Sequence, residues 1–86
     1  MKYIFTKHAK IKFANLAKIG VTISKKDILG TVKNPQHLDK ISDFPKIIAS
    51  KTIDEIHILR VVFKSEDDII TIITFYPAKR GRYYEN

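Results

Sequence analysis

The spacing of the hydrophobic residues changes once along the chain, at about residue 35. Before that point apolar side chains recur every three to four residues, as Ala9, Phe13 and Leu16 do, which is the period of an amphipathic helix. After that point the apolar residues alternate with polar ones or form short runs, which is typical of strands. The pattern therefore predicts helices in the N-terminal third and strands in the rest of the chain.

Two helices follow from this pattern and from the residues that precede them. The first is predicted from about Lys7 to Ile19, with Thr6 as its N-cap. The second is predicted from about Lys25 to Val32, with Ser24 as its N-cap. The segment Tyr3–Phe5, ahead of the first helix, fits either a short strand or a lead-in.

The strands are predicted to form an antiparallel meander. Strands are expected at Lys46–Ile53, Ile56–Lys64 and Ile69–Tyr76, and Leu38–Ile41 fits a fourth, short one. Because the helices come first and the strands follow without alternation, the predicted class is α+β, with two N-terminal helices packed on a three- to four-stranded antiparallel sheet. The 86 residues can build one modest core, so residues 1–86 are interpreted as a single domain.

The strand predicted at 56–64 carries an arginine, Arg60, in the middle of an apolar run. Alternation along the strand puts this arginine on the face opposite to the predicted core side. A symmetric turn to the next strand places Arg60 opposite Ile73, whereas a one-residue bulge places it opposite Thr74 and on the same face as Tyr76. The sequence leaves both registers open.

The charge of the chain points to a polyanionic partner. Sixteen Lys and Arg against nine Asp and Glu give a net charge of +7, and seven lysines precede the first carboxylate, Asp27. Nucleic acid, an anionic membrane surface or an acidic protein would suit such a chain, and a lysine-rich soluble surface is the plainer interpretation. There is no cysteine, and no apolar run has the length of a membrane span or a signal peptide, so a cytoplasmic protein is expected.

The remaining candidate chemistry belongs to arginine, lysine, histidine and tyrosine. The three histidines stand apart in the sequence, and no metal-ligand motif, phosphate-binding loop or nucleophile elbow is present. Cleavage of RNA without a metal needs a base for the 2′-hydroxyl, an acid for the leaving oxygen and positive charge for the transition state. Arginine suits the last task because its planar fork matches phosphate oxygens.

Several short motifs follow one another along nearly the whole chain. They are Thr6-Lys7-His8-Ala9 with Lys12, Gly20-Val21 before a capped helix, Asn34-Pro35, Arg60-Val61-Val62, and Thr74-Phe75-Tyr76-Pro77 before a basic, tyrosine-containing tail. In this order they resemble the RelE-like toxin superfamily, near its small uncharacterised branch and the BrnT-type ribonuclease toxins of type II toxin–antitoxin loci. The resemblance implies a RelE-like, barnase-related fold, an mRNA interferase-like endoribonuclease that uses neither metal nor cofactor, and a cognate antitoxin protein that neutralises it.

The resemblance also suggests which side chains do the chemistry. Catalytic roles go to His8, Arg60, Arg82 and Tyr83, and RNA-binding roles to Lys12, Thr74, Tyr76 and Arg80. Lys79 and Tyr84 are added as RNA-binding residues because they lie in the basic, aromatic tail, which suits phosphate contact and base stacking. As a hypothesis, the arginines at 60 and 82 stabilise the phosphate, while His8 or Tyr83 exchanges protons. The C-terminal hairpin and tail would then form one wall of a cationic site, with the first helix as the other wall.

Plainer interpretations stand beside these roles. Arg60 could form a structural ion pair with Asp39 or Asp43, and Lys12 could be an ordinary solvated lysine. His37 and His57 are interpreted as structural or surface residues. The alternative functions are a non-catalytic nucleic-acid-binding or regulatory module of the same fold, and an interaction domain that binds an acidic partner.

Overall fold

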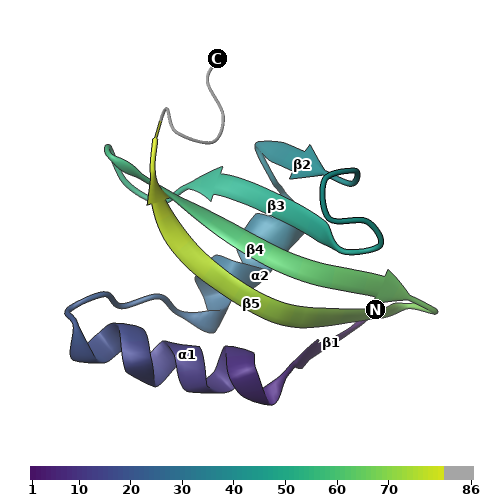
Figure 1. The fold of residues 1–86 in the computed structure, drawn as a ribbon, viewed down its shortest axis with the longest axis horizontal. Coiled ribbons are helices and arrows are strands. Elements are labelled where there is room, and N and C mark those ends of the chain that lie inside the picture. The colour runs from purple at the N-terminus through teal and green to yellow at the C-terminus, as the bar shows by residue number, and fades with distance from the viewer. Residues whose placement is uncertain (81–86) are drawn as a thin grey trace.

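In the computed structural model, which describes residues 1–80, two helices pack against one side of a five-stranded sheet (Figure 1). The helices are α1 (Lys7–Lys18) and α2 (Lys25–Lys33). The strands are β1 (Lys2–Phe5), β2 (His37–Asp39), β3 (Ile47–Thr52), β4 (His57–Glu66) and β5 (Ile69–Lys79). Their order across the sheet is β1-β5-β4-β3-β2. The prediction of an α+β chain with two N-terminal helices is confirmed.

Both helices begin at the predicted caps. The Thr6 hydroxyl accepts a hydrogen bond from the Ala9 amide at 3.1 Å and donates one to the Ile73 carbonyl at 3.0 Å, so it also ties the start of α1 to β5. Ser24 and Asp27 form a reciprocal capping box at the start of α2, with bonds of 3.1 and 3.0 Å. The local sequence therefore fixes where each helix starts.

The sheet differs from the predicted one in size and in direction. It has five strands instead of three or four, and β1 runs parallel to β5, with Tyr3 opposite Ile70. Tyr3–Phe5 therefore belongs to a strand and is not a lead-in. The period-2 pattern could not reveal this pairing, because the two strands that pair lie at opposite ends of the chain.

The strand predicted at Leu38–Ile41 is instead β2, at His37–Asp39. It stops early because the Asp39 carboxylate accepts hydrogen bonds from the amides of Ile41 and Ser42, at 3.0 and 2.9 Å, which turns the chain out of the sheet. β5 continues through Pro77 to Lys79, beyond Tyr76, where the sequence pattern predicts its end. Its N-terminal part pairs with both β1 and β4, but only β4 pairs with it at Pro77, and an edge tolerates a residue that lacks an N–H.

The core lies between the helices and the sheet. Leu59 and Val61 of β4 and Phe75 of β5 are fully buried there. The Phe13 ring of α1 lies 4.7 Å from the Phe75 ring, centroid to centroid, and 5.9 Å from the Phe5 ring. Because side chains alternate along a strand, the residues between these core positions point away from both helices. We call that side of the sheet the helix-free face.

The turn between β4 and β5 decides which residues share the helix-free face. Asp67 and Asp68 both have positive φ, 49° and 65°, as a two-residue type I′ hairpin requires. Further along the hairpin, a register shift of one residue between Val62 and Phe63 moves the pairing, so Arg60 lies opposite Tyr76. The partners predicted for Arg60, Ile73 and Thr74, are therefore both wrong, although the shared face agrees with the bulged register.

Candidate functional site

Four polar side chains form one row across the helix-free face. Tyr76 on β5 lies opposite Arg60 on β4, Arg60 lies opposite Ser50 on β3, and Ser50 lies opposite His37 on β2. Residues directly opposite one another in antiparallel strands share a face, and neighbouring strands are about 4.8 Å apart. The row, called the polar row below, therefore crosses the sheet over about 14 Å from the Tyr76 backbone to the His37 backbone.

The contact between Arg60 and Tyr76 is the best-defined feature of the polar row. The Nε–H of Arg60 donates a hydrogen bond to the Tyr76 hydroxyl at 2.9 Å, and its guanidinium carbon lies 5.7 Å from the centre of the Tyr76 ring. Both residues are half-buried. The carboxylate of Asp39, a predicted ion-pair partner of Arg60, is bonded instead to the backbone of its own turn. Tyr76 thus fixes the plane in which the Arg60 fork lies.

Two buried hydroxyls lie beside this pair. Within residues 1–80 the side-chain oxygens of Ser50 and Thr74 have no hydrogen-bond partner, and Ser50 is fully buried. A buried hydroxyl without a partner costs about 1–3 kcal/mol of stability. Apolar side chains such as Ile48 and Val62 occupy neighbouring positions on the same face.

The outer end of the polar row is held in place by residues on both sides of His37. The Gln36 side-chain oxygen accepts bonds from the amide and the hydroxyl of Thr52, each at 2.8 Å, and the Gln36 amide donates to the Ser50 carbonyl at 2.9 Å. On the other side, the amide and hydroxyl of Ser42 and the amide of Ile41 lower the pKa of Asp39 from 3.8 to about 2. The exposed His37 therefore lies on an anchored edge strand.

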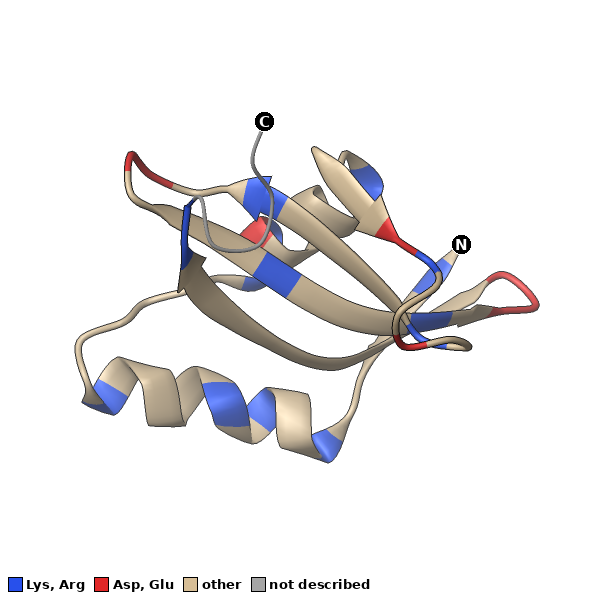
Figure 2. Cartoon of the chain, turned by 45° about the horizontal axis from the view of Figure 1, so that its top comes forward, with Lys and Arg blue, Asp and Glu red and all other residues tan. Residues whose placement is uncertain are grey.

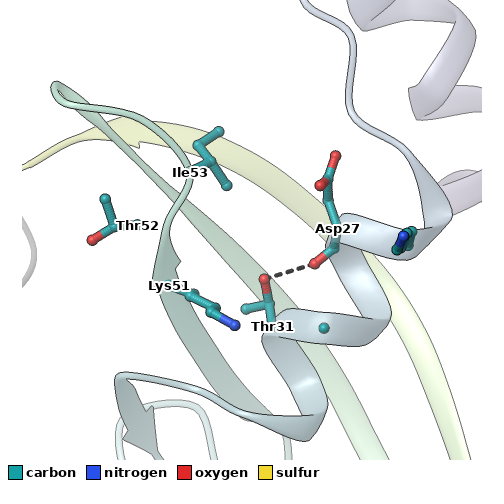
Figure 3. Close-up of a pocket in the computed structure, with 7 residues that line it drawn as sticks. Asp27, Thr31, Lys51, Thr52 and Ile53 are labelled. Atoms are coloured by element: carbon teal, nitrogen blue, oxygen red, sulfur yellow. Dashed lines mark hydrogen bonds between the residues drawn. The ribbon is translucent and has the colours of Figure 1, made fainter.

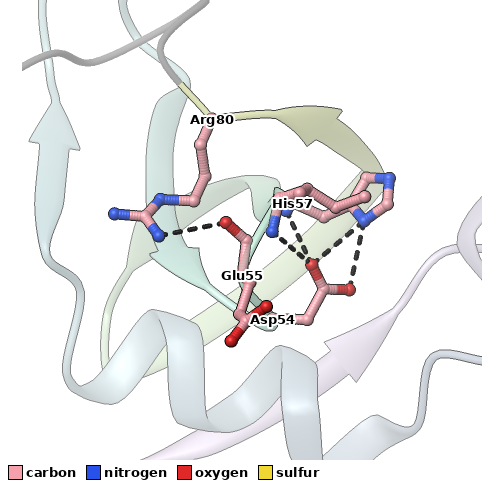
Figure 4. Close-up of polar contacts among 5 residues, drawn as sticks. Asp54, Glu55, His57 and Arg80 are labelled. Carbon is pink, nitrogen blue, oxygen red and sulfur yellow. Dashed lines mark hydrogen bonds and ion pairs between the residues drawn. The ribbon is translucent and has the colours of Figure 1, made fainter.

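Two of the predicted RNA-binding residues, Lys79 and Arg80, lie at the end of β5. Lys79 is opposite His57, so it points to the side of the sheet that carries the helices. The Arg80 guanidinium donates to the Glu55 carbonyl at 3.1 Å and its amide donates to the Ile56 carbonyl at 2.9 Å, which ties β5 to the β3–β4 turn (Figure 4). Neither residue belongs to the polar row.

The β3–β4 turn itself is stabilised by Asp54. Its carboxylate accepts the amides of Ile56 and His57 at 2.8 and 2.7 Å and contacts the His57 ring at 3.1 Å (Figure 4). These contacts, first the Ile56 amide and then the His57 side chain, lower the pKa of Asp54. His57 therefore has a structural role in the turn, as the sequence suggested.

The predicted residues on the first helix lie apart from the polar row. Helix α1 packs through Ala9 and Phe13 against the core side of the sheet, so His8 and Lys12 do not share a face with Arg60. Figure 2 shows the Lys residues of α1 along the helix, while the Asp and Glu residues lie mostly at the ends of the strands and in the connecting loops, with Asp27 in the first turn of α2. The predicted second wall of the site is therefore a separate cationic surface.

The structure thus brings together Arg60, Thr74 and Tyr76 among the predicted site residues. Arg82, Tyr83 and Tyr84 lie outside the described residues. His37 and Ser50 were missed as site residues, because their neighbourhood depends on the pairing of β2 with β3 and of β3 with β4. No local sequence signal marks either residue.

Away from the polar row, residues 1–80 line two hollows. One, of about 370 Å³, lies between α2 and β3, and Asp27, Thr31 and Lys51 are among the residues that line it (Figure 3). The Thr31 hydroxyl in its wall donates to the Asp27 carbonyl at 2.8 Å. A smaller one, of about 240 Å³, is lined by the loop after α1 and by the Asp54–His57 pair. Neither includes a residue of the polar row.

Residues 1–80 contain no group of three His, Asp or Glu side chains that could hold a metal ion. In the same part of the chain, no helix is both long enough and apolar enough to span a bilayer. The chain matches no protein-family model, no curated protein and no solved structure.

Proposed function

We propose that this protein is a metal-independent endoribonuclease of the RelE-like, barnase-related type, which acts on messenger RNA in the cytoplasm as the toxin of a type II toxin–antitoxin pair. The observation that carries the proposal is the Arg60 guanidinium, which a tyrosine hydroxyl orients at 2.9 Å on a sheet face that neither helix covers. In this proposal Arg60 binds the scissile phosphate.

The chemistry explains why an oriented arginine supports this function. When a ribose 2′-hydroxyl attacks the adjacent phosphodiester, negative charge builds up on the non-bridging oxygens of phosphorus. A guanidinium held in one plane can donate two parallel hydrogen bonds to these oxygens, and orienting it beforehand removes the cost of doing so in the transition state. The bond from Tyr76 uses Nε and fixes that plane.

The overall charge supports RNA as the substrate. The net charge of +7 attracts a polyanion, and the lysines of α1 would add contacts to the RNA backbone outside the polar row. The same positive charge would suit an acidic antitoxin. Such a protein could neutralise the toxin by covering Arg60 and the neighbouring face of the sheet.

Expression in a bacterial host and RNA cleavage by purified protein test the proposal together. The wild type is expected to arrest growth and to cut single-stranded RNA, and Arg60→Ala is expected to lower the cleavage rate by about 10²–10³-fold, as loss of a transition-state charge contact does. Lys64→Ala is the matched control, because it removes a positive charge from the same strand and the same face. Arrest and cleavage that persist in Arg60→Ala would refute the assignment.

A second candidate is a module that binds nucleic acid without cutting it. The position of the α1 cations, away from the polar row, favours it, because an extended basic surface binds a phosphate backbone whether or not a catalytic site is present. It predicts RNA binding whose affinity falls steeply with salt, and RNA that stays intact on long incubation with the wild-type protein.

A further inference from the structure

From the order of side chains in the polar row we infer that His37 is the general base and Tyr76 the general acid of the RNA cleavage, one on each side of Arg60. The inference rests on the proposed ribonuclease function and identifies its proton-transfer groups. It replaces His8 in the hypothesis drawn from the sequence, since α1 lies on the core side of the sheet.

The reaction itself demands such an arrangement. Attack of the 2′-oxygen and departure of the 5′-oxygen occur on opposite sides of phosphorus, so the base and the acid must lie on opposite sides of the group that binds the phosphate. In the polar row, Tyr76 follows Arg60 on one side, and Ser50 and then His37 follow it on the other. A phosphate bound to Arg60 would therefore have an imidazole on one side and a phenol on the other.

Each group has the properties that its role needs. The exposed His37 lies at the rim of the sheet, where the ribose of an incoming nucleotide has access, and histidine is the side chain that most often serves as a general base. The Tyr76 oxygen accepts a hydrogen bond from Arg60, so its own hydrogen remains available to donate. The same guanidinium stabilises the phenolate that forms when this proton leaves.

The step balances in atoms and protons. Neutral His37 takes the proton of the 2′-hydroxyl, the 2′-oxygen bonds to phosphorus, and the bond from phosphorus to the 5′-oxygen breaks. Tyr76 gives its proton to that oxygen. The products are a 2′,3′-cyclic phosphate and a free 5′-hydroxyl, and exchange with water returns both side chains to their starting forms.

The assignment also orients the RNA on the sheet. The nucleotide that supplies the 2′-hydroxyl lies over β2 and β3, near His37, and the nucleotide that leaves lies over β5, near Tyr76. The chain of the RNA therefore runs across the strands, in its 5′ to 3′ direction, from β2 toward β5.

Single-turnover cleavage of two RNA oligonucleotides tests the inference. One is unmodified, and the other carries a sulfur in place of the scissile 5′-oxygen, a leaving group that needs no protonation. On the unmodified RNA, His37→Ala and Tyr76→Phe are each expected to be about 10²–10⁴-fold slower than the wild type, the usual contribution of a general acid or base. On the sulfur substrate the cleavage rate of Tyr76→Phe should return to near that of the wild type, whereas His37→Ala should remain slow.

The outcomes separate a catalytic role from a merely structural one. If Tyr76 only orients Arg60, the sulfur leaving group will not rescue Tyr76→Phe, and the acid assignment is overturned. If His37→Ala cuts as fast as the wild type while His8→Ala loses activity, the base assignment is overturned. If the wild type and Lys64→Ala cut RNA but neither His37→Ala nor Tyr76→Phe is slower, this inference alone fails. A wild-type protein that cuts no RNA overturns the proposed function and this inference together.

Discussion

The two faces of the sheet are formed by alternate residues of the same strands, but one face builds the core and the other carries the polar row. On the side that carries the helices, β4 and β5 present Leu59, Val61 and Phe75, all fully buried against α1 and α2. On the helix-free face the residues between them are Arg60 and Tyr76, half-buried and joined by a hydrogen bond. A strand that alternates in this way can contribute to the core with every second residue, and the intervening positions remain available for a polar site.

The difference also shows in the hydrogen bonding of the two faces. The core side relies on apolar burial and on the aromatic contacts of Phe13 with Phe5 and Phe75. The helix-free face buries two hydroxyls, Ser50 and Thr74, that have no partner within residues 1–80. Polar groups that lower stability where they stand are expected at functional sites, because selection for activity can retain them.

The largest expected effect is on the core side. Phe75→Ala removes a fully buried ring that contacts Phe13, so the free energy of unfolding should fall by about 3–5 kcal/mol. Urea unfolding followed by circular dichroism measures the change. Tyr76→Phe is the matched control on the other face and should cost far less. A Phe75→Ala protein within about 1 kcal/mol of the wild type would contradict the division between the two faces.

In the polar row, a substitution is expected to change the free energy of unfolding by less and in the opposite direction. Ser50→Ala deletes a buried hydroxyl that has no partner in the described part of the chain, so stability should stay the same or rise by about 1 kcal/mol. RNA cleavage should nevertheless become slower, because Ser50 lies between His37 and Arg60 in the polar row, opposite both of them. Urea unfolding curves measure the change in stability, and single-turnover cleavage by the same protein preparation measures the change in rate.

A serine that serves only the fold predicts a different pair of results. In that case Ser50→Ala would leave cleavage unchanged, and the larger Ser50→Thr would be the variant that perturbs the protein, because there is little room for a methyl group at a fully buried position.

The smallest effect concerns the edge strand that carries His37. The pKa of Asp39 is lowered from 3.8 to about 2 by bonds from Ser42 and Ile41, so the folded state favours the ionised carboxylate. The resulting contribution to folding stability is fully present at pH values above the ordinary pKa of 3.8, and it is lost as the pH falls from about 4 to about 2. The melting temperature of Asp39→Asn should therefore lie slightly below that of the wild type near pH 6, and the two should converge toward pH 2. A difference in melting temperature that stays constant down to pH 2 would contradict a stabilising role of the Asp39 carboxylate.

Much of the fold could be predicted from local sequence. Both helices begin where Thr6 and Ser24 cap them, and the strand segments of β3, β4 and β5 carry the expected alternation. The parallel pairing of β1 with β5 could not be predicted, because the interaction joins residues from the two ends of the chain and leaves no local pattern. The early end of β2 depends on the side-chain bonds of Asp39, which propensity does not reveal.

The candidate site was only partly predictable for the same reason. Arg60 could be identified from the sequence, because a charged residue in an apolar strand must be paired or must serve a function. The residue that lies opposite Arg60 could not be predicted. The turn alone would place Phe75 opposite Arg60, but the one-residue register shift near Val62 places Tyr76 opposite it instead. His37 and Ser50 carry no signal of their own and join the row only through the pairing of β2, β3 and β4.

By itself, the sequence determined the helices, the strand segments, the positive charge and the isolated arginine, since each depends on residues close together in the chain. Only the tertiary structure decided which side chains surround that arginine. Strand register is set by turns, bulges and contacts between distant segments, and a shift of one residue moves every side chain of a strand to the other face. The polar row of His37, Ser50, Arg60 and Tyr76 is therefore a product of the register of four strands.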